Sequence, residues 1–558
     1  MQNRRSSTLF VATFIVLLGL PLVLSHSIVP SAGGTTTKTE QLVTDSTAQY
    51  IGKVNVAALP TPTEGTVTPL SLPDLSLSTQ QQVGTDPPAP IVTPGSQSFI
   101  HIAKNFAGTP GTNPNPCRCT PPDMGLAASS KFVVQMVNLA GTIWKNNGVR
   151  VTTFSLSDFW FLPVRGGPLG IGMSDPQVLY DAAADRFYAS IIDTFDVNRV
   201  NFAVTATNDP TGTWFIYRVI ANCNPVTPYS NCSPASANTL PDQPYIGYSS
   251  NKFLIAVNDF DTTSGFFIGV QYWILNKAEM LSGCTVPTPC PGGRNIDAVT
   301  NVVTPGNNHW AIRPAQHLST TSTAYMAENC LTVTSAVLTN TCPTAPAGSG
   351  GINVFTITGT PPGPTTVIPT TVPVASMSFP GRADQPGNAA SLGTNDALRM
   401  LSIVWRNDVL WTASHEGCTP DSPSTPRTCA RLDQISTASY VASQDFDLGF
   451  AGQYVFYPAL STDSSNNLVL LYGRSSLSLF PTLEVTGQLA TMPALTLGAS
   501  ALLIAGTAAD YTGRWGDYFW AATDPATPNT FWVSGEYRTV SLFQGWSTQV
   551  GEISFNPT

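Results

Sequence analysis

Residues 175–192 read DPQVLYDAAADRFYASII, and residues 242–259 repeat the pattern as DQPYIGYSSNKFLIAVND. Each stretch has a short run of β-branched and aromatic residues, a polar turn and a second such run, which is typical of two strands joined as a hairpin. Fainter or equal copies begin at Pro122, Arg313, Leu398, Tyr457 and Gly516. A hairpin that recurs about every 50 to 80 residues indicates radial repetition of one sheet. The sequence therefore predicts an all-β fold, a seven-bladed β-propeller over residues 97–558, rather than an array of β-sandwiches.

The hairpins also carry recognisable motifs: PPD with FVVQMVN (121–138), DPQVLYDAAADRFYAS (175–190), PDQPYIGY (241–248), GDY with TFWVSGEY (516–537) and WSTQVGEISF (546–555). Taken together, they resemble a family of secreted bacterial propeller-like proteins. The resemblance implies the propeller fold and export from the cell, and it implies no particular activity. One departure is the turn MGLAASS (124–130), where relatives look more like a Gly-Asp-bearing turn.

The first 96 residues differ from the rest of the chain. Residues 1–25 have the features of a signal peptide: Arg4 and Arg5 precede an apolar run from Leu9 to Leu24 that is short for a membrane span. Residues 26–96 are rich in Thr, Pro, Ser and Gly, a composition typical of a disordered linker or stalk, with residues 49–57 (QYIGKVNVA) as a weak candidate for a short strand. We therefore expect a secreted, extracellular or cell-surface protein with no transmembrane segment after cleavage. An uncleaved anchor is the alternative.

The chain has 10 cysteines, which fall in close pairs along the sequence. Because propeller strands are connected locally, we expect disulfides Cys223–Cys232, Cys284–Cys290, Cys330–Cys342 and Cys418–Cys429. Cys117 and Cys119 form a CxC pair whose role the spacing leaves open, since so short a bridge is strained. A zinc site would need CxxC or His/Cys clusters at ligand spacing, and the sequence has neither.

Charge and motifs exclude several functions. Only 11% of residues are charged and the net charge is −9, so nucleic acid, which needs clustered Lys and Arg, is not an expected partner. The usual hydrolase, metalloprotease and nucleotide-binding motifs are missing from the sequence. The stretch STDSSNNL (461–468) has the Ser and Asp of a sialidase Asp-box without its Gly and Trp, so an ordinary hairpin turn is favoured.

Two acidic loops, DTFDVN (193–198) and NDFDTTSG (258–265), carry alternating oxygen ligands that suit Ca²⁺. Neither matches the EF-hand pattern, and solvated turns explain both. We predict no cofactor and keep Ca²⁺ as the alternative.

Equivalent positions of a propeller repeat lie at one end of the molecule. Charged residues stand at or near the starts of several repeats: Asp123, Asp175, Asp242, Arg313 and Asp517. We predict a ligand-binding site at that end, formed by Asp175, Asp242, Arg313, Arg514 and Asp517. The alternative is that these carboxylates cap turns and pair with the arginines.

Three functions fit the sequence. The first is a non-catalytic binding module for an extracellular polysaccharide, another polymer or a surface protein. The second is a sialidase-like glycoside hydrolase or polysaccharide lyase, which would need two carboxylates flanking the bond to be cleaved. The third is a structural envelope protein.

Overall fold

The computed structural model describes most of the chain from residue 34 to residue 556. Within this range it leaves out residues 37, 64–69, 72–76, 83–85, 168–169, 196–198, 222–238, 263–264, 266, 283–294, 302–308, 335–336, 388, 395–396, 422–425 and 544. The predicted signal peptide and the predicted disulfides Cys223–Cys232 and Cys284–Cys290 lie outside the described residues.

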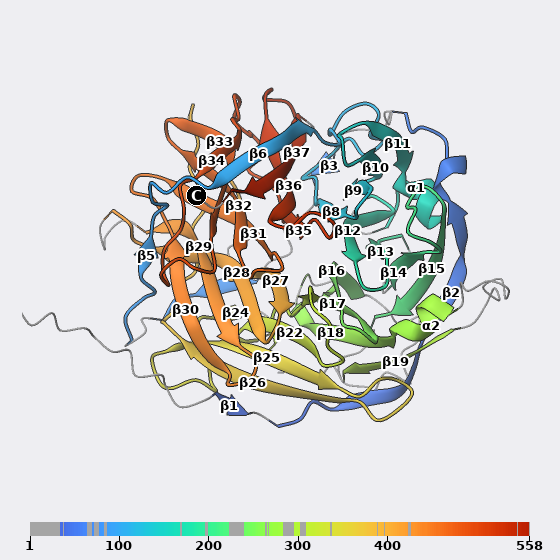
Figure 1. The fold of residues 1–558 in the computed structure, drawn as a ribbon, viewed down its shortest axis with the longest axis horizontal. Helices are drawn as coiled ribbons and strands as arrows, with labels where there is room; N and C mark the ends of the chain where they lie inside the picture. Colours follow the sequence, from blue (N-terminus) through green and yellow to red (C-terminus); the bar gives the residue numbers. More distant parts are fainter. Residues whose placement is uncertain are drawn as a thin grey trace, which may run out of the picture. The chain divides into compact units, whose positions relative to one another are not determined.

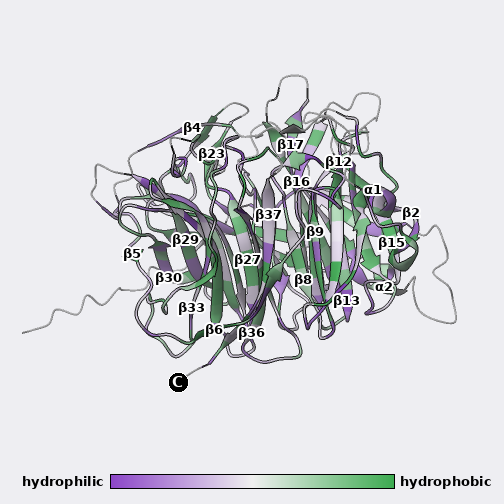
Figure 2. Cartoon of the chain, turned by 90° about the horizontal axis from the view of Figure 1, so that it is seen from above, coloured by the Kyte–Doolittle hydropathy of each residue, from purple (hydrophilic) through white to green (hydrophobic). Residues whose placement is uncertain are grey.

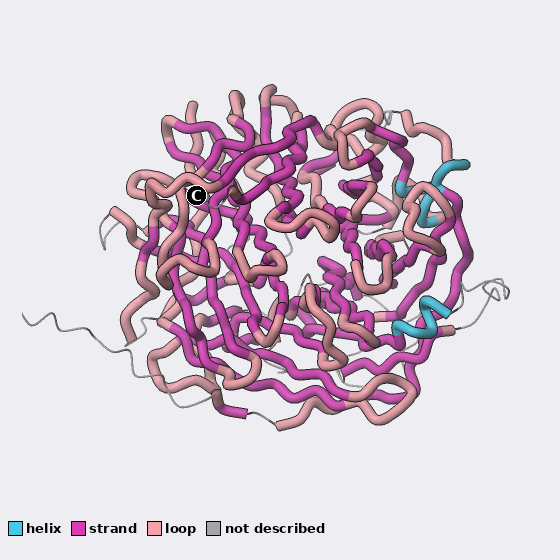
Figure 3. The backbone as a smooth tube through the Cα atoms, in the orientation of Figure 1, coloured by secondary structure: helices cyan, strands magenta, loops and turns pink. Residues whose placement is uncertain are grey.

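Strands dominate the structure, as Figure 3 shows. The helical segments of the described chain are one turn or little more: η1 (Val56–Ala58), α1 (Leu156–Trp160) and α2 (Lys277–Ser282). In the described part, no helix has the length and hydropathy that a membrane span requires. The prediction of an all-β protein is confirmed.

Each predicted hairpin forms the first two strands of a four-stranded antiparallel meander. The first three meanders are β8–β11 (Gly125–Ala128, Phe132–Val137, Ala140–Lys145, Arg150–Ser155), β12–β15 (Met173–Asp181, Arg186–Asp193, Arg199–Thr205, Thr213–Ile220) and β16–β19 (Thr239–Tyr248, Lys252–Asp261, Phe267–Asn276, Ile296–Asn301). The fourth consists of β20, β22, β25 and β26 (Arg313–Pro314, Ala324–Asn329, Gly350–Thr358, Thr366–Val374).

The remaining meanders follow the same order along the chain. The fifth and sixth are β27–β30 (Met400–Arg406, Val409–Cys418, Arg427–Ser436, Val441–Leu448) and β31–β34 (Tyr454–Thr462, Leu468–Ser476, Leu479–Gln488, Ala501–Ile504). The seventh begins with β35–β37 (Trp520–Thr523, Thr530–Arg538, Trp546–Phe555). Short strands β21 (Gln316–His317), β23 (Thr332–Val333) and β24 (Val337–Thr339) accompany the fourth meander.

The seventh meander takes its last strand from the other end of the chain. Strand β6 (Ile100–Ala107) pairs antiparallel with the C-terminal strand β37, with Phe106 opposite Val550. The alternating patterns of residues 98–106 and 548–555 predict two strands of one sheet, and the pairing confirms this prediction. The chain thereby closes on itself through backbone hydrogen bonds, which cover strand edges that would otherwise be open.

The first strands of the meanders pack against one another in cyclic order. Strand β8 contacts β12, and the contacts continue through β16, β20, β27, β31 and β35, which contacts β8 again. Figure 1 shows the sheets following one another around a common centre, from teal through green and orange to red. The inner strands are almost wholly buried, as at Thr239–Tyr248.

The hydrophobic core lies between neighbouring meanders. Five clusters of buried apolar side chains each combine residues from adjacent sheets. In one, Tyr188 of β13 stacks on Phe253 of β17 with 5.1 Å between ring centroids. Such pairs add ~0.5–1.5 kcal/mol beyond the area that they bury. Figure 2 shows the hydrophobic residues concentrated on the strands, for example on β8, β27 and β33.

A residue in the left-handed conformation lies just before the first strand of every meander or within its first residues. These residues have φ between 45° and 60°, and they are Asp123, Asp175, Gln243, Ala311, Leu398, Tyr457 and Asp517. The backbone there must turn from the outside of the ring into the centre. In three cases proline follows and the pairing register shifts, at Asp175-Pro176, Gln243-Pro244 and Tyr457-Pro458. A bulge is one of the few places where a strand tolerates proline.

Side chains on the second strands hold these turns from the preceding meander. The Asp175 N–H donates to Asn138 Oδ1 (3.2 Å), and the Ala311 N–H donates to Asn258 Oδ1 (3.0 Å). The Tyr457 N–H donates to His415 Nε2 (2.5 Å). Each bond therefore joins one meander to the next at its point of greatest curvature.

Much of the predicted stalk is instead part of the folded domain. Strand β2 (Leu42–Asn55) runs between β15 and β19 and joins the second and third meanders into one sheet. The short strands β1 (Thr35–Thr36), β3 (Leu70–Ser71), β4 (Ser78–Gln80) and β5 (Ile91–Val92) pair with β26, β7 (Cys119–Thr120), β24 and β30.

The expectation of a disordered linker over residues 26–96 is therefore wrong for these strands. Two outer strands, β15 and β19, leave unpaired N–H and C=O groups at their edges, and β2 satisfies both. Ala48 and Val54 are buried by this pairing. Composition indicates how much apolar surface a segment can bury, but it does not show that two strands elsewhere in the chain have unpaired edges.

The described part of the chain contains three disulfides. Cys330–Cys342 and Cys418–Cys429 join the pairs expected from their spacing. The CxC pair, Cys117–Cys119, is also bonded.

Removing the closing strand should unfold the ring. We expect deletion of residues 546–556 to lower the melting temperature by more than about 10 °C, because it removes the buried Trp546, Val550, Ile553 and Phe555 and exposes the edges of β36 and β6. The control deletion removes residues 557–558 alone. Equal melting curves for the two proteins, followed by circular dichroism, would contradict closure by β37.

Candidate functional site

The predicted ligand site contains a cluster of charged side chains at the starts of the inner strands. Asp517, Asp123 and Asp175 are the left-handed residues of three consecutive meanders, the seventh, first and second. Asp242 lies one residue before the left-handed Gln243 and Arg313 lies two residues after Ala311. Asp123, Asp175 and Asp517 thus share the left-handed position of their meanders, and Asp242 and Arg313 lie one and two residues from it.

The three left-handed carboxylates influence one another electrostatically. Burial raises the pKa of Asp123 well above its ordinary value, and the carboxylates of Asp517 and Asp175 raise it further. Burial and Asp517 also raise the pKa of Asp175. Arg514 binds both oxygens of Asp517, from Nη1 to Oδ1 (2.7 Å) and from Nη2 to Oδ2 (2.9 Å). Burial and mutual repulsion thus favour the protonated forms of Asp123 and Asp175, while Arg514 pairs with Asp517.

Asp242 and Arg313 belong to the same neighbourhood through other partners. Arg399 Nη1 donates to Gln243 Oε1 (2.8 Å) and lies 3.6 Å from Asp242 Oδ2. The Gln243 N–H donates to Asp175 Oδ2 (3.1 Å), which connects this pair to the carboxylate cluster. The Arg313 guanidinium lies over the Tyr245 ring, 4.2 Å from its centroid.

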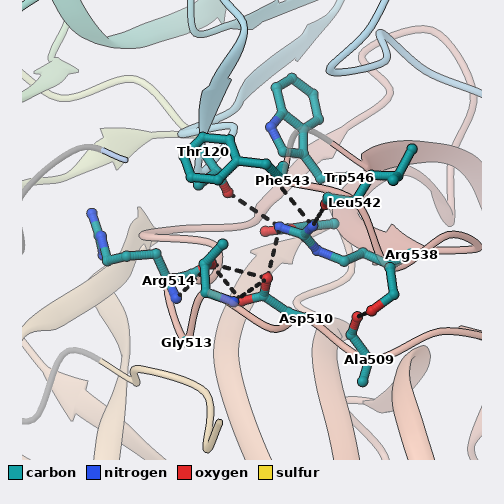
Figure 4. A network of polar contacts seen from close by, with 12 residues as sticks. Thr120, Ala509, Asp510, Gly513, Arg514, Arg538, Leu542, Phe543 and Trp546 are labelled. Carbon is teal, nitrogen blue, oxygen red and sulfur yellow. Dashed lines mark hydrogen bonds and ion pairs between the residues drawn. The ribbon is translucent and has the colours of Figure 1, made fainter. Parts of the chain in front are cut away.

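A buried ion pair supports the loop that carries Arg514 and Asp517. Arg538 Nη2 lies 3.2 Å from Asp510 Oδ1 and donates to Thr120 Oγ1 (3.1 Å), while Nη1 donates to the Leu542 carbonyl (2.8 Å). Figure 4 shows Arg538 at the centre of these contacts, between segments that are distant in the sequence. Both charged side chains are 0% exposed, and Glu536 Oε1, 3.5 Å from Arg538 Nε, is a second buried acidic partner of this arginine.

This end of the ring is closed. The predicted site residues Asp175, Asp242, Arg313 and Asp517 are 4%, 9%, 6% and 7% exposed. The cavity beside Arg313 and Trp520 measures about 10 Å³, which is about the room that one water molecule needs. The cluster therefore has the character of a structural network, which fits the turn-capping alternative: most of its charged atoms are buried and have partners, with Asp123 Oδ1 and Arg313 Nη1 as buried exceptions among the described residues.

A much larger cavity, about 440 Å³, lies where the inner strands end. Its lining comes from the β12–β13, β16–β17, β31–β32 and β35–β36 turns, the residues after β21 and the end of β27. Six of the seven meanders thus contribute to it; within the described residues only the first does not. The carboxylate cluster lies where the inner strands start, and this cavity lies where they end, so the two are separate sites.

Three buried aspartates shape the rim of this cavity. Asp181 Oδ1 accepts from the N–H groups of Ala183 and Ala184, at 3.0 and 3.2 Å. Asp463 and Asp524 cap their own turns in the same way. These are the turns that Asp and Ser favour, and STDSSNNL is one of them, as the hairpin interpretation predicted.

The floor of the cavity is polar and internally paired. Lys277 Nζ lies 2.5 Å from Asp181 Oδ2 and donates to the Ser249 carbonyl (2.5 Å). His317 Nδ1 donates to the Tyr248 carbonyl (2.5 Å), and its Nε2 accepts from the Tyr325 N–H (3.2 Å). Burial lowers the pKa of His317 to about 3, so the ring is neutral at physiological pH.

The sequence carried a signal for this cavity that repeat starts alone did not reveal. Asp181, Asp463 and Asp524 occupy the same turn of three different repeats. A second set of recurring carboxylates, at the other end of the hairpins, marked the rim. Whether the cavity stays open depends on the sizes of the side chains that six meanders contribute to its lining, and a repeat pattern does not specify these sizes.

The two loops considered for Ca²⁺ hold their carboxylates in other ways. Asp193 Oδ2 lies 3.8 Å from Arg218 Nη2 and 4.0 Å from Arg199 Nη1. Asn258 accepts the hydrogen bond from Ala311, while Asp259 is fully buried. Within the described residues, no three Asp, Glu, His or Cys side chains are grouped as metal ligands.

Comparisons with known proteins give a fold likeness only. No family model matches the sequence, and no curated protein matches it. A protein of unknown function from Dyadobacter fermentans is 9% identical, with 71% of this chain and 98% of that chain covered at a TM-score of 0.37. A Hadza microbial sialidase is 8% identical, with 75% and 73% covered at a TM-score of 0.34.

An α-L-arabinofuranosidase from Fusarium graminearum is 8% identical, with 68% of this chain and 92% of that chain covered at a TM-score of 0.32. Likenesses at this level carry no argument about what this chain binds.

The carboxylate cluster should make stability depend on pH. Because the folded state raises the pKa of Asp123 above the ordinary value of 3.8, protonation stabilises the fold at low pH, and this contribution is lost as the pH rises through the folded pKa. Asp123→Asn keeps an acceptor for Asn138 but cannot ionise. We expect its free energy of unfolding in urea to exceed that of the wild type increasingly from pH 4 to pH 8.

Asp408→Asn is the matched control, since Asp408 is also left-handed, with φ of 62°, but is exposed. A difference between Asp123→Asn and the wild type that stays constant with pH would show that Asp123 does not titrate in this range.

Proposed function

We propose that the protein is a secreted, seven-bladed β-propeller that binds an extracellular polysaccharide or similar hydroxylated polymer in the 440 Å³ cavity at the ends of its inner strands. The observation that carries the proposal is the convergence of turns from six meanders on one cavity. A radial repeat gathers one turn from each sheet at its axis, so short segments scattered over 350 residues, from about 180 to 529, form a single wall.

The size and chemistry of the cavity support a small part of a polymer as ligand. Its volume lies within the ~300–1,000 Å³ of typical ligand sites. Ser250, Thr320 and Ser464 present exposed hydroxyl groups along the rim, and Tyr180 offers an aromatic side chain. Hydroxyls and aromatic faces are groups that hydrogen-bond and stack on sugars.

The closed end of the ring is the weaker candidate. The residues first predicted as ligands, with Asp242 and Arg313 among them, are buried and have protein partners. None of the paired carboxylates there lines the 440 Å³ cavity. A glycosidase mechanism needs two accessible carboxyl groups about 5–10 Å apart around a bound sugar, so binding is favoured over catalysis.

Export is supported by the N-terminal sequence and the cysteine chemistry. Arg4 and Arg5 before the apolar run to Leu24 are typical of a signal peptide. Disulfides such as Cys330–Cys342 persist in oxidising compartments. We expect the protein recovered from the exported fraction to begin at or near residue 26, as N-terminal sequencing would report; an intact residue 1 in that fraction would indicate a retained anchor.

Filling the cavity should abolish binding without unfolding the protein. We expect Ala526→Trp to remove binding on an immobilised glycan array, because Ala526 is exposed on the cavity wall and an indole would occupy its volume. Ser130→Trp is the control, since Ser130 is exposed in the corresponding turn of the first meander, outside the cavity lining.

The carboxylate cluster gives the opposite control. Asp517→Asn should lower stability by ~1–3 kcal/mol through loss of a charged partner for Arg514, while glycan binding persists. Binding that survives Ala526→Trp but disappears in Asp517→Asn would return the ligand to the closed end. No binding by the wild type to any glycan would favour a structural envelope role.

A further inference from the structure

Resting on the proposed function, we infer that the ligand of the 440 Å³ cavity carries a carboxylate, and that Arg406 at the end of β27 selects it. The polymer would then be an acidic polysaccharide built from sugar acids, rather than a neutral one. The argument starts from which charged groups of the cavity wall a ligand can still reach.

Charged side chains of the lining differ sharply in exposure. Asp181, Lys277, Asp463 and Asp524 are 1%, 3%, 1% and 7% exposed, so their charges lie behind the cavity surface. Arg406 is the remaining charged residue of the described lining apart from neutral His317, and it is partly exposed. A ligand that enters the cavity therefore meets a guanidinium before any carboxylate.

The buried charges are already engaged by the protein. Lys277 pairs with Asp181, as described above. Asp524 Oδ1 accepts from two turn N–H groups, and its Oδ2 accepts from Trp532 Nε1 (3.1 Å). A carboxylate that accepts several hydrogen bonds repels or attracts a ligand more weakly than a carboxylate without donors. The reason is that the partial positive charges of the donors lie close to it and offset its negative charge.

Arg406 has hydrogen-bonding capacity to spare. A guanidinium has five N–H donors, and Arg406 donates from Nη2 to the Thr462 carbonyl (3.1 Å). Its Nε also has no hydrogen-bond partner in the part of the chain that the structure describes, but this atom is buried, so the donors left for a ligand are those of the Nη atoms. Planar carboxylates match the fork of such donors better than any neutral sugar hydroxyl does.

The surroundings also make an anion favourable for Arg406. Burial lowers the pKa of Arg406, so water already stabilises this cation incompletely, although Asp463 acts in the other direction. The nearest carboxylate, Asp463, has its own donors in Ser465, Asn467 N–H (2.9 Å) and Asn467 Nδ2 (2.8 Å). A partly desolvated charge without a dedicated counter-ion is stabilised when a bound anion supplies one.

The rest of the rim suits the remainder of a sugar acid. Exposed hydroxyls of Ser250, Thr320 and Ser464 surround the cavity, and Ser319 Oγ, which accepts from the Asn407 N–H (2.9 Å), lies next to Arg406's strand end. The arrangement provides one strong anion contact and several neutral ones. A neutral sugar bound in the same position would leave Arg406 without a charged partner, and this difference gives specificity for the acidic ligand.

The test compares acidic polysaccharides with their own carboxyl-reduced forms, so that the backbone stays the same. The probes are polygalacturonate, alginate and hyaluronan, each before and after chemical reduction of the carboxylates, titrated into the full exported chain. We expect at least one acidic polymer to bind, its reduced form to bind at least about 10-fold more weakly, and rising salt to weaken binding.

Variants separate the inference from the proposed function. Arg406→Gln should weaken binding of the acidic polymer by about 10- to 100-fold, the loss expected for charged hydrogen bonds. Arg406→Lys, which keeps the charge but not the fork, should fall between Gln and the wild type. Melting curves of both variants check that the fold is retained.

Equal binding of acidic and reduced polymers, or unchanged binding by Arg406→Gln, would overturn the carboxylate inference while leaving the cavity as the site. Binding that Ala526→Trp does not affect would overturn the cavity itself, and with it the proposed function. If none of the acidic polymers binds the wild type, the inference falls, whether or not a neutral glycan does.

Discussion

The ring of sheets depends on a hydrogen bond from one meander to the left-handed turn of the next. Each inner strand is introduced by a residue whose φ is positive, a conformation that most side chains avoid. Asn138, Asn258 and His415 each accept from the backbone N–H of such a residue in the following sheet. The strained turn and its fixed partner define where one sheet stops and the next begins. The buried aromatic contacts between sheets then fill a geometry that these bonds have already set.

The same geometry separates two chemistries along one axis. Where the inner strands begin, the turns bring Asp123, Asp175 and Asp517 so close together that protons and Arg514 must compensate them. Where the strands end, the carboxylates of the hairpin turns hold their own backbone N–H groups, and the space between them stays open. A buried charge network stiffens one end, while the other retains the room and the polar surface that a ligand needs.

Hairpins and their order could be predicted because each copy carries its own local signal. DPQVLYDAAADRFYASII contains two strands and a turn within 18 residues, and no distant partner is needed to recognise it. The role of Leu42–Asn55 could not be predicted, because its strand exists only between β15 and β19, more than 150 residues away. Gathering of the charged residues followed from the repeat, but their burial did not. Arg399, which pairs with Asp242 and Gln243, is the second residue of the copy that begins at Leu398, but no pattern marked it as their partner.

Strand β6 completes the last sheet with residues from the first fifth of the chain. Strand β2 pairs with strands of the second and third sheets, which are synthesised after it. Loop closure over such separations is slow compared with local hairpin formation. During synthesis, β6 therefore has no strand partner until β37 (Trp546–Phe555) has appeared. Pairing of β6 with β37 completes the last sheet. The hairpins of the chain can form separately before that, and the domain becomes one cooperative unit only when β37 has paired.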